Sequence, residues 1–321
     1  MRRTVVRTMT ATTVSIALLA TGLPAANAAE DSAEATARLI ADVAPDQGDV
    51  IEGKQDHEGI SASVDNVDIT VPTDPTAPIV LAAPTDGKSL AVSLPAGLDL
   101  ASGVVASDGT LVFSANAGGA DAAVQILENG SARIQTIIPD ASAQHEFTYR
   151  FGDGVTPILT EDGAVLLTTA LDGSSSTVIG ELAVPWAVDA AGQAVETAYV
   201  IEGDAVTQQV DAEREATYPI LADPSISYGL GIYYHFNRAE TTTLAGYGLA
   251  GAASITAGCA ALGSLAAGIG AVVAGAACAA VGGPFFFQAG VAENSKPKRC
   301  VYAVLRGPAL ISGTYKDARC K

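Results

Sequence analysis

Short apolar runs that alternate with polar positions dominate the chain between Ile60 and Asp223. The runs are SASVDNVDITV, KSLAVSLP, TLVFSA, AVQIL, ARIQTII, HEFTYRF, GAVLLTTA, TVIGELAVPWAV, ETAYVIEG and AVTQQV. A period of two is typical of strands that bury one face. Because so many half-apolar strands must cover one another, the pattern predicts an antiparallel β-sandwich over residues 60–223, with an irregular β-rich fold as the alternative.

Turn dipeptides separate these runs. They are Asp86-Gly87, Asp108-Gly109, Asn129-Gly130, Asp153-Gly154, Asp162-Gly163 and Asp172-Gly173. Asn-Gly and Asp-Gly tolerate positive φ at both central positions of a type I′ turn, so each dipeptide predicts a hairpin. An alternative is that loops such as TEDGAVLLTTALDGSS bind calcium. They lack the D-x-D-x-D-G spacing and the closing glutamate of a calcium loop, which favours simple turns.

The first 59 residues precede the sandwich. Basic residues stand before an apolar run near Val14 to Leu23, and small residues follow up to Ala28. This order predicts a secretory signal peptide over residues 1–28, cleaved near Ala28, because the run is shorter than the ~20 residues of a retained anchor. Residues 29–59 then predict a short helix from Ser32 to Val43 and a flexible polar tether from Pro45 to Gly59.

A different pattern begins after Pro219 and Pro224, which hold the preceding residues extended. SISYGLGIYYHF predicts one more strand. Asn237 followed by Glu240 then has the spacing of a capping box, which predicts the start of a helix.

The remaining chain is rich in alanine and glycine. Thr241 to Ala292, a run of 52 residues, contains no charged side chain, and Gly268-Ile269-Gly270 interrupts it. Two helices of bilayer length would fit, but such small side chains give little transfer energy, which favours a buried helical hairpin covered by Phe285-Phe286-Phe287. Residues 224–321 therefore predict a compact module of a helical hairpin and a terminal β-hairpin, and the whole chain an α+β, predominantly β fold.

All four cysteines lie in this module, and secretion would oxidise them. Four cysteines permit three pairings. A turn near Gly268 favours a disulfide between Cys259 and Cys278, and a hairpin turn after Arg306 favours one between Cys300 and Cys320. Zinc binding is the competing interpretation, and the absence of C-x2-C or C-x4-C spacing disfavours it.

PWAVDAAGQAVETAYVIEGDAVTQQVDAEREATYPILADP resembles the closing part of a β-rich module in uncharacterised secreted proteins of actinobacteria, through its YPxxxDP exit. SYGLGIYYHFNRAET and the cysteine-containing Ala/Gly-rich tail are similar to C-terminal segments of the same group. The resemblance covers about Ile60 to Lys321. The group has no assigned activity, so the resemblance implies no functional residue.

Charge is distributed unevenly within a net charge of −18. Ala29 to Ala222 contains 6 Lys+Arg against 31 Asp+Glu, a balance of −25, whereas Asp223 to Lys321 contains 8 against 4, a balance of +4. The acidic part disfavours nucleic acid as a partner and is typical of a solubilising surface. The candidates for contact with a membrane surface or another part of the cell envelope are Lys296, Lys298, Arg299 and Arg306, followed by Lys316, Arg319 and Lys321.

The sequence offers little support for catalysis. His57, His145 and His235 stand outside H-E-x-x-H, and neither a G-x-S-x-G elbow nor a phosphate loop is present. Trp186, the one tryptophan, is expected in a core. We therefore expect no catalytic residue, metal or cofactor, and no particular small-molecule ligand is indicated.

The function expected from these patterns is non-catalytic. An acidic β carrier domain would present a C-terminal effector or binding module at the cell exterior. The alternatives are a membrane-active, bacteriocin-like C-terminal module and an extracellular hydrolase, for which His235, among tyrosines, is the best histidine candidate.

Overall fold

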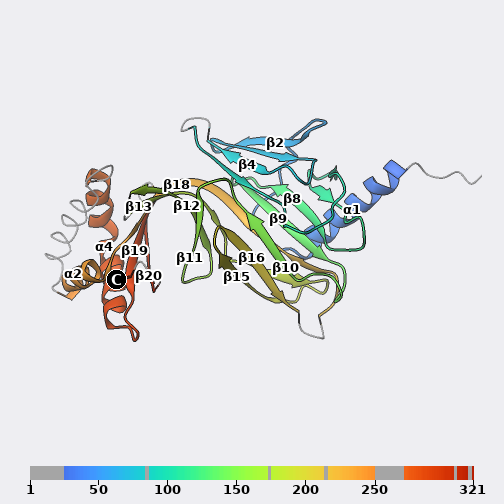
Figure 1. Cartoon of the computed structure of the whole chain (residues 1–321). Coiled ribbons are helices and arrows are strands. Elements are labelled where there is room, and N and C mark those ends of the chain that lie inside the picture. The colour runs from blue at the N-terminus through green and yellow to red at the C-terminus, as the bar shows by residue number, and fades with distance from the viewer. Residues whose placement is uncertain are drawn as a thin grey trace, which may run out of the picture.

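The computed structural model describes residues 25–83, 87–172, 175–212, 216–249, 271–306, 309–316 and 320–321. These residues are mostly β, with several antiparallel sheets and three helices, as the sequence predicts. Figure 1 shows an elongated molecule with the stacked sheets in the centre, α1 at one end and the C-terminal module at the other.

The first sheet contains five strands in chain order, and its neighbours pair antiparallel. The strands are β1 (Lys54–Gln55), β2 (Gly59–Val64), β3 (Val67–Pro72), β4 (Ile79–Ala82) and β5 (Ser89–Val92). SASVDNVDITV, expected as one run, is the hairpin of β2 and β3. Asp65 and Asn66 turn the chain with φ values of 48° and 64°, the two positive values of a type I′ turn.

The second sheet contains twelve strands. Its main path runs β11-β12-β13-β18-β9-β8-β7-β6, while β14 and β17 attach at β9 and β19 and β20 attach at β18. The bounds are β6 (Val104–Val105), β7 (Leu111–Phe113), β8 (Asp121–Ile126), β9 (Ser131–Ile138), β11 (Val155–Leu159), β12 (Val165–Asp172), β13 (Ser175–Leu182), β14 (Ala187–Asp189), β17 (Ile220–Ala222), β18 (Ser225–His235), β19 (Cys300–Arg306) and β20 (Ala309–Tyr315).

A third sheet has the order β10-β16-β15. Its strands are β10 (Glu146–Arg150), β15 (Glu196–Glu202) and β16 (Ala205–Asp211). Buried side chains of all three sheets form one core, including Leu81, Val124, Phe147, Leu167 and Val206. The predicted packing of β-layers over a shared apolar core is confirmed.

Several predicted hairpins form, but with a different turn. In the turn from Leu127 to Gly130, the Gly130 N–H donates to the Leu127 carbonyl (3.0 Å) and the Leu127 N–H donates to the Ser131 carbonyl (2.9 Å). Only Gly130 has positive φ, which is a type I turn with a glycine bulge. The turns that contain Asp108-Gly109 and Asp162-Gly163 have the same two hydrogen bonds at the equivalent positions. The type I′ prediction is therefore wrong there, because the loops have three residues and only the last needs positive φ.

The other turn dipeptides behave differently. Asp153-Gly154 connects β10 to β11, which belong to different sheets, so the predicted hairpin is wrong at this position. At Asp86-Gly87 and Asp172-Gly173, one residue of each pair lies outside the described residues. The strands on either side, β4 with β5 and β12 with β13, pair antiparallel.

The predicted helix at Ser32 to Val43 is present as the longer α1 (Ala25–Val43). Ala33, Ala37 and Ile40 are buried with residues of β7, β8, β9 and β17 in a second cluster on the outer face of the large sheet. Trp186, expected in a core, is partly buried and packs against the edge of the same cluster. Residues 1–24 lie outside the described part, and cleavage near Ala28 stays a prediction.

Residues 45–59 are bound to the sandwich, which corrects the expectation of a flexible tether. The Ile51 N–H donates to the Ile126 carbonyl (2.8 Å), and the Glu128 N–H donates to the Asp49 carbonyl (2.9 Å). Gly109 permits this approach, because a Cβ there would stand 2.4 Å from Glu52 Cα. The polar pattern concealed the segment because it binds the sheet through main-chain groups and through a polar side chain, Gln47, whose Oε1 accepts a hydrogen bond from Ser225 Oγ (2.9 Å).

The C-terminal module contains α2 (Arg238–Leu249), α4 (Ala271–Asn294) and the predicted hairpin of β19 and β20. The capping box is confirmed: the Asn237 N–H donates to Glu240 Oε2 (2.8 Å), and the Glu240 N–H donates to Asn237 Oδ1 (3.0 Å). Residues 250–270, with Gly268 and Cys259, lie outside the described part, as does the Cys278 side chain. The Cys259–Cys278 pairing therefore stays a prediction.

The terminal hairpin is closed by the predicted disulfide between Cys300 and Cys320, with a Cα–Cα distance of 5.5 Å. Strand β18 connects the module to the sandwich. Its first residues pair with β9, Ile226 to Tyr234 pair with β13, and Ile232 to His235 pair with β19. The predicted β-hairpin is thus present within residues 224–321, and it continues the large sheet through β18.

Candidate functional site: a cationic pocket on the C-terminal module

A pocket of about 330 Å³ lies where the end of α4 and the end of β20 meet the turn between β11 and β12. Its lining combines three cations, one carboxylate and apolar groups. The lining residues are Glu161, Val291, Ser295, Lys296, Pro297, Arg299, Thr314 and Lys316. Residues of both the module and the sandwich therefore line the pocket.

The segment after α4 is held by bonds to the last turn of the helix. Ser295 Oγ donates to the Ala292 carbonyl (2.7 Å), and the Arg299 N–H donates to the same carbonyl (3.1 Å). These bonds satisfy a carbonyl that a helix end leaves free. They also fix Lys296 beside the helix C-terminus, where the helix dipole favours a cation.

Arg299 is neutralised within the pocket. Its Nη1 donates to Glu161 Oε1 (2.6 Å) and to Thr314 Oγ1 (3.2 Å). Thr314 Oγ1 also donates to Glu161 Oε1. Glu161 follows β11, so this ion pair attaches the module to the sandwich.

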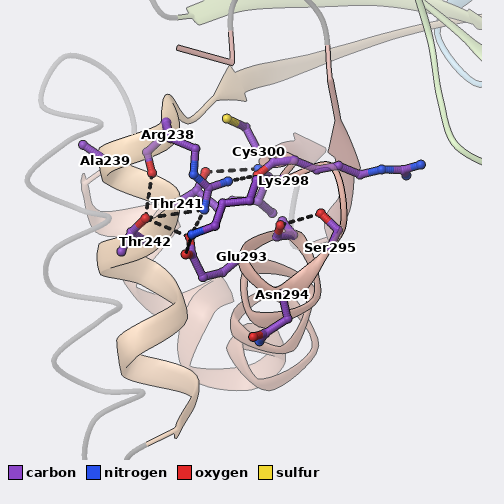
Figure 2. A network of polar contacts seen from close by, with 12 residues as sticks. Arg238, Ala239, Thr241, Thr242, Glu293, Asn294, Ser295, Lys298 and Cys300 are labelled. Atoms are coloured by element: carbon purple, nitrogen blue, oxygen red, sulfur yellow. Dashed lines mark hydrogen bonds and ion pairs between the residues drawn. The ribbon is translucent and has the colours of Figure 1, made fainter.

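Lys298 is engaged in a second network, which Figure 2 shows from close by. The ammonium of Lys298 and the guanidinium of Arg238 both pair with the carboxylate of Glu293. Thr242 Oγ1 donates to Glu293 Oε2 (2.8 Å). The network connects α2 to α4, so Lys298 has a structural role.

Lys296 and Lys316 carry the remaining positive charge of the pocket. Both are exposed, and neither belongs to an ion pair among the residues that the structure describes. Of the four predicted contact residues, Lys296 and Arg299 line the pocket and Lys298 does not, whereas nothing is described of the Arg306 side chain.

An apolar strip on α4 adjoins the pocket. Phe287 is 71% exposed and Val291 is 44% exposed, and their spacing of four residues places them on one face of the helix. Phe285 and Phe286 are buried in the core of the module, as expected. The expectation that Phe287 covers the hairpin is wrong, because one turn of helix cannot direct three consecutive side chains to the same side.

The histidines lie elsewhere. His145 Nε2 lies 3.0 Å from the Tyr218 hydroxyl, and His57 is exposed beside Glu58. The ring of His235 contacts that of Tyr315 edge-on at 6.3 Å. None of the three lines the pocket. The part of the chain that the structure describes also contains no group of three or more His, Cys, Asp or Glu side chains that could hold a metal ion.

A buried polar cluster surrounds Asp223. The sequence pattern identified this residue only as the end of the predicted sandwich. Asp223 is fully buried, and its Oδ1 accepts a hydrogen bond from the Trp186 N–H (3.0 Å). Burial raises the pKa of Asp223 to about 7, and the charge of Arg133 on β9 offsets only part of this effect.

Two tyrosines belong to the same cluster. Burial and the charge of Asp223 raise the pKa of Tyr149 and of Tyr199 well above the usual value. Their hydroxyls and Asp223 Oδ2 have no hydrogen-bond partner among the described residues. Because Asp223 and Tyr149 are 0% exposed and Tyr199 is 5% exposed, the cluster belongs to the interior of the protein, and the pocket is the candidate site.

No protein-family model fits the chain, and no curated protein is significantly similar to it. The function of the candidate site must therefore be inferred from its geometry and charge.

Proposed function

We propose that the protein is a non-catalytic binding protein of the cell exterior, in which the C-terminal module binds an anionic component of the cell envelope and the acidic sandwich acts as its carrier. The observation that carries this proposal is the exposure of Lys296 and Lys316 at one pocket, with no carboxylate paired to either among the described residues.

The uneven distribution of charge supports binding through the C-terminal module. Residues 29–222 carry a balance of −25 and residues 223–321 a balance of +4. Figure 1 places the module at the end of the molecule opposite α1. An anionic surface would therefore repel the sandwich and attract the module, which orients the protein with the pocket toward that surface.

Binding at a surface requires no membrane-spanning element. Among the helices that the structure describes, none has the length and apolar character needed to cross a bilayer. The bacteriocin-like alternative and the extracellular hydrolase have no comparable support in the described contacts, so we propose surface binding alone.

The first prediction concerns the two exposed lysines. The full-length protein with Lys296→Gln and Lys316→Gln is expected to bind isolated bacterial cell envelopes about 10- to 30-fold more weakly, because each cation near an anionic surface contributes about 1 kcal/mol. Sedimentation of the protein with the envelopes at increasing protein concentration measures the change. Raising the salt concentration should also weaken the binding of the wild type to the envelopes, because salt screens the attraction between the lysines and the surface.

A matched control removes the same charge from the sandwich instead of the module. Lys54→Gln with Lys88→Gln changes two exposed lysines of the five-stranded region and should leave binding unchanged or only slightly weaker, because it makes the acidic sandwich a little more negative. Equal binding by the two double variants, or no binding of the wild type to envelopes at low salt, would overturn the proposal.

A further inference from the structure

The pocket and the apolar strip form one continuous surface. Val291 belongs to both, because it lines the pocket and lies one helical turn from the exposed ring of Phe287. Cations stand at one side of this surface and hydrocarbon at the other. A ligand that matches it must carry negative charge and apolar groups next to each other.

The charges facing the pocket leave a net attraction for an anion. Glu161 is its one carboxylate, and Arg299 pairs with it at 2.6 Å. Lys296 and Lys316 remain without an ion pair in the described part of the chain. A volume of about 330 Å³ is at the lower end of small-ligand pockets, which span about 300–1,000 Å³. A phosphate-bearing head group is of suitable charge and size.

Resting on the proposed function, we propose that the anionic component is the phospholipid surface of a bilayer. The phosphate of an acidic lipid lies in the pocket against Lys296 and Lys316, while Phe287 and Val291 enter the boundary between head groups and acyl chains. This combination of apolar side chains and adjoining cations is the one by which interfacial helices bind acidic membranes.

Two other occupants fit the surface less well. A soluble anionic polymer would engage the lysines but would leave Phe287 in water. A second copy of the chain, related by two-fold symmetry through Phe287, would bring the two sets of Lys296 and Lys316 toward each other. A bilayer offers phosphate and hydrocarbon side by side without this repulsion.

The test is flotation of the full-length, oxidised protein with vesicles. One set contains equal parts of phosphatidylglycerol and phosphatidylcholine, and the other contains phosphatidylcholine alone. We expect binding to the acidic vesicles, binding at least about tenfold weaker to the neutral ones, and a loss of about tenfold or more for Phe287→Ser on the acidic vesicles.

Val184→Ser is the matched control, because Val184 is 48% exposed but lies on the sandwich. It should bind acidic vesicles as the wild type does. Unfolding midpoints of both variants verify that the folds are intact, which is expected since both side chains are exposed.

Three results would overturn the membrane inference while the proposed function stands. They are binding to envelopes but not to acidic vesicles, equal flotation of Phe287→Ser and the wild type, and a dimer in light scattering that Phe287→Ser converts to a monomer. Failure to bind both envelopes and vesicles would overturn the proposed function as well.

Discussion

Asp223→Asn is expected to be more stable than the wild type at about pH 8, with the advantage disappearing near pH 4. The pKa of Asp223 is about 7 in the folded protein, whereas the ordinary pKa of an aspartate is 3.8. Between these values the folded state retains a proton that the unfolded state releases, so the folded wild type loses stability as the pH rises. At 1.36 kcal/mol per pKa unit, the loss is complete above about pH 7 and reaches about 4 kcal/mol.

Asparagine can keep the hydrogen bond between Asp223 and the main chain of Trp186, which is one of several that the aspartate accepts. Its amide oxygen can accept the hydrogen bond that the Trp186 N–H donates to Asp223 Oδ1. It carries no charge at any pH, so it avoids the cost of an ionised group in the core. Urea unfolding of both proteins at several pH values between about 4 and 8 measures the difference, in which the contributions of the other carboxylates largely cancel.

Asp74→Asn provides a control, because the pKa of Asp74 is shifted in the opposite direction from that of Asp223. Asp74 is exposed, and hydrogen bonds from Thr76 lower its pKa. Its contribution to stability is present above the unfolded pKa and is lost as the pH falls through the folded value. The difference between this variant and the wild type should therefore change only under acidic conditions. A pH-independent difference for Asp223→Asn would refute our account of the buried carboxyl.

Removing the disulfide by Cys300→Ala with Cys320→Ala is expected to loosen the C-terminal hairpin. The cysteines are 20 residues apart in the chain. A crosslink that closes a loop of this length stabilises the folded state by about 3 kcal/mol, mainly by restricting the unfolded chain. Among the described residues, the core of the module gathers a few side chains around Phe236, Phe285 and Phe286, so we expect the disulfide to contribute much of the local stability of the hairpin.

Hydrogen exchange of the full-length protein measures this effect where it occurs. Amides of β19 and β20 should exchange about 100-fold faster in the double variant, while those of β8 and β9, in the centre of the sandwich, should keep their rates. Uniform loss of protection across the chain would show that the disulfide stabilises the whole protein. Unchanged rates in β19 and β20 would contradict the expected stabilisation of the hairpin.

The alternation of apolar and polar residues predicted most strands because antiparallel strands at a surface bury every second side chain. In β3 and β4, Ile69, Val71, Ile79 and Leu81 are buried in this way. Turn geometry was less predictable. Asn-Gly and Asp-Gly occur in both two-residue and three-residue loops, and only the strand register decides between them. The Asp65-Asn66 turn was missed because it contains no glycine.

The sequence predicted the cluster of cations that follows the uncharged run, but it did not predict the pocket. Lys296 and Arg299 follow a long uncharged run, which made them visible as a local pattern. Glu161, which completes the pocket, is 138 residues away from Arg299 in the chain. No periodicity or motif connects residues at that separation. The exposure of Phe287 also depends on how α4 packs, which an apolar sequence with few polar residues does not reveal.

Strand β18 has a consequence for proteolytic processing near residue 223. A cut at Asp223-Pro224 would leave β18 paired with β13, and a cut after Phe236 would leave β19 paired with β18. In either case the two polypeptides would remain together as halves of a split protein. They would elute as one species under native conditions and separate only in denaturant.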